Sequence, residues 1–240
     1  MIGGNQPVRK RVIVGATCFA DADAAIEMAA KLARKVEADV LGLLVEDDAI
    51  VRYARSPSAK TLTFQRGSRQ HVTPKTMGRA FQRDARVFEH RLSSAARQAA
   101  VRWSFERQRG HIIPLLHSVA VAGDFIFLGY QKTPLARGQI VFIDHGGKGE
   151  GQLFNLSKEI AQEMGLALQT IHLSKSEKPP SRADSDLFSM ALNASEQEML
   201  DYLRTASPTA VIVAISPQHH FDLDEMLKAA RCSVILAVQA

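Results

Sequence analysis

The chain has 240 residues, of which 46% are hydrophobic and 23% are charged. This composition is typical of a globular protein and unlike that of a disordered or fibrous one, and the length suffices for one large or two small domains. Two cysteines, Cys18 and Cys232, exclude a disulfide framework and a zinc site of the usual spacing. No apolar run approaches the ~20 residues that span a bilayer, and residues 1–10 lack the apolar core of a secretion signal. We therefore expect a cytoplasmic protein without a membrane partner.

Strands and helices alternate along the chain. Continuous apolar runs predict strands buried on both faces of a parallel sheet, and apolar residues at helical spacing predict the helices between them. A basic insertion without periodicity interrupts this order at about 48–80. In order, the sequence predicts strand 11–14, helix 24–36, strand 39–47, helix 81–99, edge strand 101–107, helix 112–122, strand 124–130, strand 138–144, helix 152–164, strand 166–173, helix 187–203, strand 210–215, helix 223–230 and strand 232–238.

The net charge of +5 is unevenly distributed. Residues 52–110 hold 14 Lys or Arg against 3 Asp or Glu, so the rest of the chain is net negative. Such a stretch can attract nucleic acid, acidic partners or anionic lipid, but a solvated helix face or a mobile basic loop gives the same count. Because no binding motif or aromatic stacking platform accompanies the charge, we do not expect nucleic acid as a partner.

Alternation over the whole length predicts an α/β fold of two consecutive doubly wound, mainly parallel-sheet units. We expect the first unit at 1–137, with the basic insertion, and a shortened second unit at 138–240. Strand 139–144 could belong to either unit. Four stretches of the sequence are informative here: "VIVGATCFADADAAIEMAAKLARKVEADVLGLLVED", "GDFIFLGY", "IVFIDHGG" and "MLKAARCSVILAV". They resemble the universal stress protein family in its tandem arrangement.

The resemblance implies where a nucleotide would bind. Family members that hold ATP use an Asp after the first strand for the adenine side and a glycine-rich turn after the fourth strand for the phosphates. Here the two ingredients lie in different halves. The first half keeps Gly129 but has Gly15 and Ala16 where the acid would stand, and the second half has Asp144 but no glycine after its fourth strand. We therefore expect degenerate motifs, no complete ATP site and no cofactor.

The glycine-rich stretch "FIDHGGKGEG" offers an alternative. Glycines and a lysine between a strand and a helix can cradle phosphate, which would make the protein an ATP or AMP binder. The candidate residues are Asp144, Gly146, Gly147, Lys148 and Gly149, with Gly129 from the first half. The spacing matches neither the Walker pattern nor the dinucleotide fingerprint, and Glu150 would repel an anion. A turn is the interpretation that we favour.

Other chemistry has weaker support. His219, His220, Asp222 and Asp224 are the densest set of possible metal ligands, but the two aspartates more simply place negative charge at the start of a helix. No Gly-x-Ser-x-Gly elbow is present. We therefore expect no metal and no catalytic residues, although the sequence does not decide whether the protein is an enzyme.

The last strand is apolar, and an uncovered apolar edge invites pairing with a second copy. The resemblance also implies dimer contacts through this strand. We therefore predict a homodimer through Val234, Ile235, Leu236 and Val238, and allow for another protein partner. The function that we expect is that of a non-enzymatic, stress-related binding or regulatory protein. The alternatives are an ATP or AMP binder that uses the second half and a scaffold for an acidic macromolecule through residues 52–110.

Overall fold

The computed structural model describes residues 9–56, 60–62, 69–129, 138–145, 150–173, 189–215 and 222–239. Its strands are β1 (Arg11–Ala16), β2 (Asp39–Asp47), β3 (Lys60–Leu62), β4 (Arg69–His71), β5 (Trp103–Gly110), β6 (Phe125–Leu128), β7 (Gln139–Asp144), β8 (Ala167–Leu173), β9 (Ser189–Ala194), β10 (Ala210–Ile215) and β11 (Ser233–Val238). Its helices are α1 (Phe19–Lys35), α2 (Asp48–Tyr53), α3 (Pro74–Gln98), α4 (Ile112–Val119), α5 (Glu150–Met164), α6 (Glu196–Ala206) and α7 (Leu223–Ala230). None of these helices is long and apolar enough to cross a membrane, as far as the described residues show.

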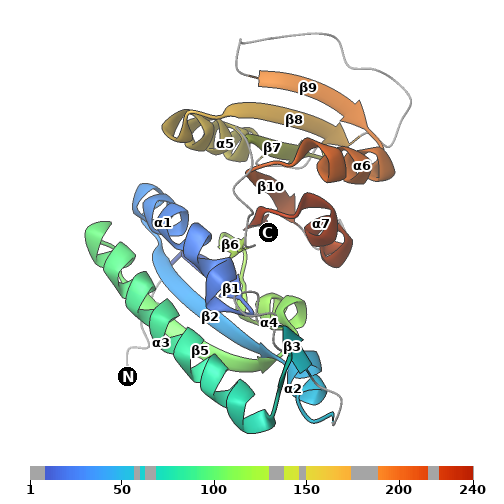
Figure 1. Ribbon diagram of the computed structural model, residues 1–240. Helices are drawn as coiled ribbons and strands as arrows, with labels where there is room; N and C mark the ends of the chain where they lie inside the picture. The colour runs from blue at the N-terminus through green and yellow to red at the C-terminus, as the bar shows by residue number, and fades with distance from the viewer. Residues whose placement is uncertain are drawn as a thin grey trace, which may run out of the picture.

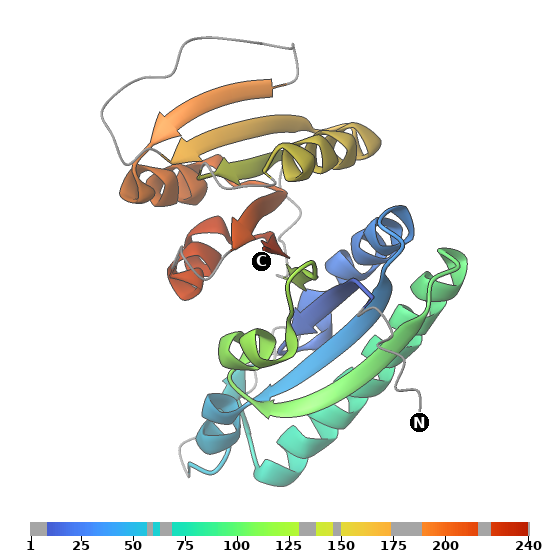
Figure 2. The same cartoon turned by 180° about the vertical axis from the view of Figure 1, so that it is seen from behind.

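Nine strands form one sheet in the order β5-β2-β1-β6-β11-β10-β7-β8-β9, and helices cover both of its faces (Figures 1 and 2). Helices α1, α3 and α5 pack on one face, and α4, α6 and α7 pack on the other. The central strands, such as β10 and β11, are largely apolar because both of their faces are buried. In β1, for example, Val12 and Val14 belong to one core and Ile13 to the other. The predicted α/β fold with a mainly parallel, doubly wound sheet is confirmed.

The two halves of the chain meet at the pair formed by β6 and β11. These two strands are antiparallel, with Phe127 opposite Ile235, whereas every other pair of neighbouring strands in the nine-stranded sheet is parallel. The first half contributes four strands to the sheet and the second half contributes five. Strand β11 therefore completes its own half and also covers the last strand of the first half.

This arrangement overturns the prediction that the last strand is an open edge for a second copy. Val234, Ile235 and Leu236 pair with residues of β6 on one side and of β10 on the other. Val238 is held as well, since its N–H donates to the Asp124 carbonyl at 2.9 Å and its own carbonyl accepts from Gly123. That edge cannot form a dimer because neighbours occupy both sides of the strand. A homodimer through another surface stays a prediction.

Asp124 connects three strands at this seam. Its side chain is 1% exposed and accepts hydrogen bonds from the Arg11 backbone N–H at 2.9 Å and from Arg11 Nη2 at 2.6 Å. Its backbone carbonyl holds the end of β11, as described above. The starts of β1 and β6 and the end of β11 are thus joined through one residue, Asp124, by its buried carboxylate and its backbone carbonyl. A buried charge is tolerated where it is paired and hydrogen-bonded in this way.

The predicted helix at 187–203 is wrong in its first part. Residues Ser189–Ala194 form β9, which pairs in parallel with β8, and the helix α6 begins only at Glu196. The start of α6 is fixed by a capping box in which Ser195 and Glu198 satisfy each other's backbone N–H groups. Apolar residues on both sides of this boundary give the impression of one continuous helical pattern.

The remaining elements agree with the sequence more closely. Strand β5 lies at the end of the sheet order, as predicted for an edge strand. Strand β7 lies between β10 and β8, so residues 139–144 belong with the second half. The basic insertion at 48–80 contains the short helix α2, the hairpin β3-β4 and the first turns of α3. The division into units at 1–137 and 138–240 stays a prediction, because the sheet is continuous between them.

The shared strand predicts that the two halves lose stability together. Ile235 is fully buried in β11, and replacing a buried isoleucine by alanine costs about 2–5 kcal/mol. Trp103, the sole tryptophan, lies in β5 of the first half. We expect Ile235→Ala to lower the urea midpoint of Trp103 fluorescence, although the two residues lie at a distance in the sheet order. Ile50→Ala is the matched control, because Ile50 is 38% exposed on α2. An unchanged fluorescence midpoint beside a lowered circular-dichroism midpoint would show that the halves unfold separately.

Candidate functional site

Doubly wound sheets bind ligands at the carboxyl ends of strands, at the point where the direction of winding reverses. In this protein those points lie between β1 and β6 in the first half, and between β7 and β10 in the second. The strands within each half are parallel, whereas β6 and β11 are antiparallel. The carboxyl ends of the strands in the two halves therefore lie on opposite sides of the sheet, one at each end of the strands, and so do the two points. Gly129 and Asp144, which mark them, are therefore kept apart.

In the first half, Gly129 is packed directly against the backbone of α1. A Cβ atom at this position would lie 1.9 Å from the carbonyl oxygen of Asp21, far inside any real contact. The Gly129 N–H also points to the Gly15 carbonyl, at 3.4 Å. The packing thus requires a glycine at this position, because β6 closely approaches the first turn of α1. The side of Gly129 on which a side chain would stand is thus occupied by the backbone of α1.

The N-terminus of α1 already has carboxylate partners. The N–H of Phe19 donates to Asp84 Oδ2 at 3.2 Å, and Cys18 Sγ donates to Asp21 Oδ2 at 3.1 Å. Burial, and then the hydrogen bond to Asp21, raises the pKa of the Cys18 thiol to about 11. Because the thiolate is the reactive form, Cys18 is a poor nucleophile at neutral pH. A helix N-terminus attracts anions, and here the protein supplies its own.

In the second half, Asp144 stands at the carboxyl end of β7, where the sequence predicts it. His172 lies directly opposite in the parallel register of β7 and β8, and its Nδ1 is 2.8 Å from Asp144 Oδ2. His145 Nε2 lies 2.7 Å from the Ala214 carbonyl oxygen, so this imidazole bridges the ends of β7 and β10 at the reversal point. Nothing in the sequence links His172 to Asp144, and only the strand register shows that the two side chains meet.

Several predicted site residues lie outside the described residues. They are Gly146, Gly147, Lys148 and Gly149 of the glycine-rich stretch, together with His219 and His220. Asp222 is described and accepts a hydrogen bond from the Glu225 N–H at 3.0 Å, which makes it the cap of α7. In the parts of the chain that the structure describes, no three His, Cys, Asp or Glu side chains converge as metal ligands.

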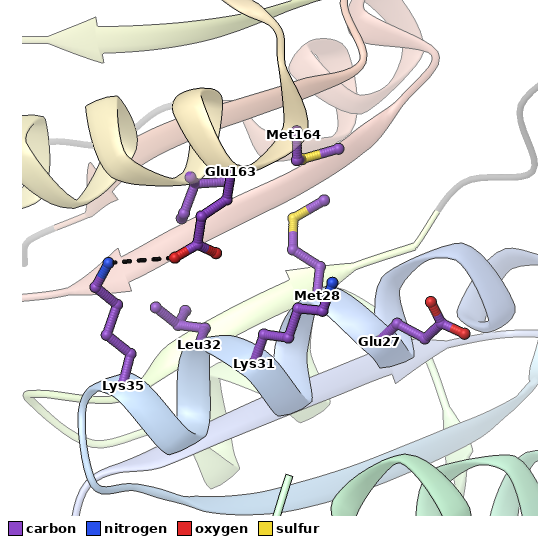
Figure 3. A pocket seen from close by; sticks show the side chains of 8 residues that line it. Glu27, Met28, Lys31, Leu32, Lys35, Glu163 and Met164 are labelled. Carbon is purple, nitrogen blue, oxygen red and sulfur yellow. Dashed lines mark ion pairs between the residues drawn. The ribbon is translucent and has the colours of Figure 1, made fainter. Parts of the chain in front are cut away.

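A groove runs between α1 and α5 (Figure 3). One hollow of about 170 Å³ has Met28, Leu32, Ile160 and Met164 in its lining, and an adjoining hollow of about 690 Å³ extends over the ends of β6 and β11. Lys35 borders both hollows and forms ion pairs with Glu159 and Glu163 of α5. The hydrogen bond to Glu159 raises the pKa of Lys35. Among the described residues that line the two hollows there is no Ser, Cys or His side chain.

Comparison with known proteins extends the description of the fold. No protein-family model matches the sequence, and no curated protein matches it. Among solved structures, a protein of unknown function from Pseudomonas aeruginosa PAO1 matches 97% of this chain and 93% of its own, with 10% identity and a TM-score of 0.50. A universal stress protein from Archaeoglobus fulgidus DSM 4304 matches 96% of each chain, with 9% identity and a TM-score of 0.48. At sequence identities this low, similarity of structure shows a shared fold alone. That the nucleotide-binding motifs are degenerate stays a prediction.

The packing of Gly129 generates a prediction about stability. Gly129→Ala places a methyl group against the Asp21 backbone, which cannot move away like a side chain, so we expect a loss of about 3 kcal/mol in the free energy of unfolding. Gly151→Ala is the matched control. Nothing lies within 4 Å of a Cβ atom at Gly151 in α5, and alanine favours a helix, so this change should be neutral or stabilising. Urea unfolding measures both. Equal effects of the two changes would contradict the close approach of β6 to α1.

Proposed function

We propose that the protein is a non-enzymatic binding or regulatory module of the universal stress protein type that works without ATP. The observation that carries this proposal is the state of the first reversal point. Gly129 packs on α1, and the Asp21 and Asp84 carboxylates hold hydrogen-bond donors at the start of that helix. The stress-related part of the proposal follows from the sequence resemblance, since a shared fold alone does not define a function.

Electrostatics supports the absence of a phosphate group at this point. Two unit charges of the same sign about 4 Å apart repel by about 4 kcal/mol at an effective dielectric constant of 20. A phosphate beside Asp84 would have to overcome this repulsion and also displace the hydrogen bond from Phe19. The main attraction of a helix N-terminus for phosphate is thus cancelled by the chain itself.

The non-enzymatic part is supported by the chemistry of the described groups. Cys18 is held as a neutral thiol, and Asp144 forms a pair with His172. A carboxylate and an imidazole can orient one another as in a catalytic triad, but nucleophilic catalysis also needs a hydroxyl or thiol within reach of the imidazole. Among the hydrogen bonds of the described residues, none joins His172 to such a group.

A second candidate function is the binding of ATP or AMP by the second half. The observation that favours it is the place of Asp144 at the carboxyl end of β7, beside the reversal point. In this candidate, Asp144 would leave His172 to contact the base, and His145 would move away from Ala214. The stretch from Gly146 to Gly149 would then supply backbone N–H groups to the phosphates.

Thermal unfolding with and without nucleotide separates the two candidates. A ligand at about a hundred times its Kd stabilises the native state by about 2.7 kcal/mol, which is easily measured as a rise in Tm. We expect no rise with ATP or AMP in the presence of Mg²⁺, and no nucleotide released from the purified protein on denaturation. A rise that is lost in Asp144→Ala and kept in the matched variant His172→Ala would contradict our proposal and establish the second candidate.

A further inference from the structure

Eight of the 14 lysines and arginines of residues 52–110 fall into two groups that differ in their partners. The first group lies on the edge strand β5 or directly before it, where each arginine has an acidic partner on or next to β2. Arg102 pairs with Asp39 and Arg109 with Asp48, each at 2.6 Å, and Arg107 pairs with Glu46. These charges are locally neutralised. The edge strand is therefore not the part of the region that attracts an anionic partner.

The second group lies on one face of α3. At about 100° per residue, its cations and one histidine fall within an arc of about 80° on the side away from the sheet. They are Lys75, Arg79, Arg83, Arg86, His90 and Arg97, and all are exposed. We call this set the α3 stripe. Among the ion pairs of the described residues, none includes a lysine or arginine of the stripe.

The other charged residues of α3 are Asp84, Glu89 and Arg91, which lie outside this arc, Glu89 by about 40°. Arg91 lies outside the arc and pairs with Asp23 at 3.0 Å and with Glu27 at 3.9 Å. Asp84 is also outside the arc and accepts the hydrogen bond from Phe19. In the sequence these residues alternate with members of the stripe. The paired charges separate from the unpaired ones only when the segment is folded as a helix.

The helix presents the stripe on a rigid support. Its opposite face is buried through Phe81, Ala85, Phe88, Leu92 and Ala96, and its first turn is closed by a capping box between Thr73 and Thr76. Helix α3 runs along the outside of the first half as one uninterrupted element (Figure 1). From Lys75 to Arg97 the stripe is about 33 Å long at 1.5 Å per residue.

We propose that the α3 stripe binds the phosphate backbone of a double-stranded nucleic acid without reading its sequence. Guanidinium groups bind phosphate oxygens through two hydrogen bonds, and four of the five permanent cations in the stripe are arginines. The length of the stripe equals about one turn of a DNA duplex, roughly 34 Å. This proposal names a partner for the scaffold alternative, and it does not depend on whether either half binds a nucleotide.

The composition of the stripe argues against other anionic partners. A helix that binds a membrane surface inserts apolar side chains, whereas the apolar face of α3 is buried against the sheet. Single-stranded nucleic acid needs aromatic side chains on which bases stack, and the stripe contains no Phe, Tyr or Trp. Protein interfaces rely on buried aromatic or apolar anchors, which are also missing from the stripe. The expectation from sequence that nucleic acid is not a partner is revised on this basis.

Fluorescence anisotropy with a labelled 24-base-pair DNA duplex tests the proposal, and an RNA duplex of the same length tests whether the backbone form matters. The variant Arg79→Gln/Arg83→Gln/Arg86→Gln removes three cations and keeps a good helix former. We expect it to weaken duplex binding by about tenfold or more at low salt, and to reduce the slope of log K against log salt by up to about 2.7. Circular dichroism establishes that the variant is folded.

The matched control is Lys31→Gln/Arg34→Gln/Lys228→Gln, which removes the same charge from exposed positions on α1 and α7. We expect duplex affinity in this control to stay within about twofold of the unchanged protein. Equal losses in the two variants would overturn the proposal, because they would reflect net charge alone. The proposal is also overturned if the unchanged protein does not bind the duplex at low salt, or if it prefers polyglutamate, single strands or phosphatidylserine vesicles.

Discussion

The structure depends on the antiparallel pairing of β6 with β11. Without it, the first half would end in an open apolar strand, and the second half would expose another. Open edges of this kind promote association with other chains. Pairing the two edges removes both at once and produces a sheet of nine strands. The outer strand of the first half, β5, is suited to an edge, because it alternates in burial and carries charged side chains.

The same pairing determines where each half can act. Because the strands of the two halves run in opposite directions, the carboxyl ends of β1 and β7 point in opposite directions along the strands. Groups at one reversal point therefore cannot complete a site at the other. In the first half, Gly129 packs on α1, and two carboxylates accept hydrogen bonds at the start of that helix. In the second half, His172 contacts Asp144, and His145 bridges the ends of β7 and β10. The long helix α3 carries the stripe of exposed cations for which the described residues supply no ion pair.

The sequence predicts most of the elements, because strands buried on both faces are continuous apolar runs and helices have apolar residues at regular spacing. It fails at 187–194, where apolar spacing suits a helix or a strand, although the capping box of Ser195 and Glu198 marks the true start of α6. The partner of β11 could not be predicted, because an apolar strand pairs equally well with its own chain or with a copy. Asp144 could be selected from its position after a strand. The contacts of His172 and Asp84 depend on the register of strands and the packing of helices that are distant in sequence.

Native-state hydrogen exchange tests the shared strand most directly, because it measures the free energy at which each segment opens. Our account predicts that the amides of β6 and β11 are protected to the same extent as those of β10, which lies inside the second half of the sheet. Protection of β6 that is weaker than that of β10 by orders of magnitude, as expected for an unpaired edge strand, would contradict it.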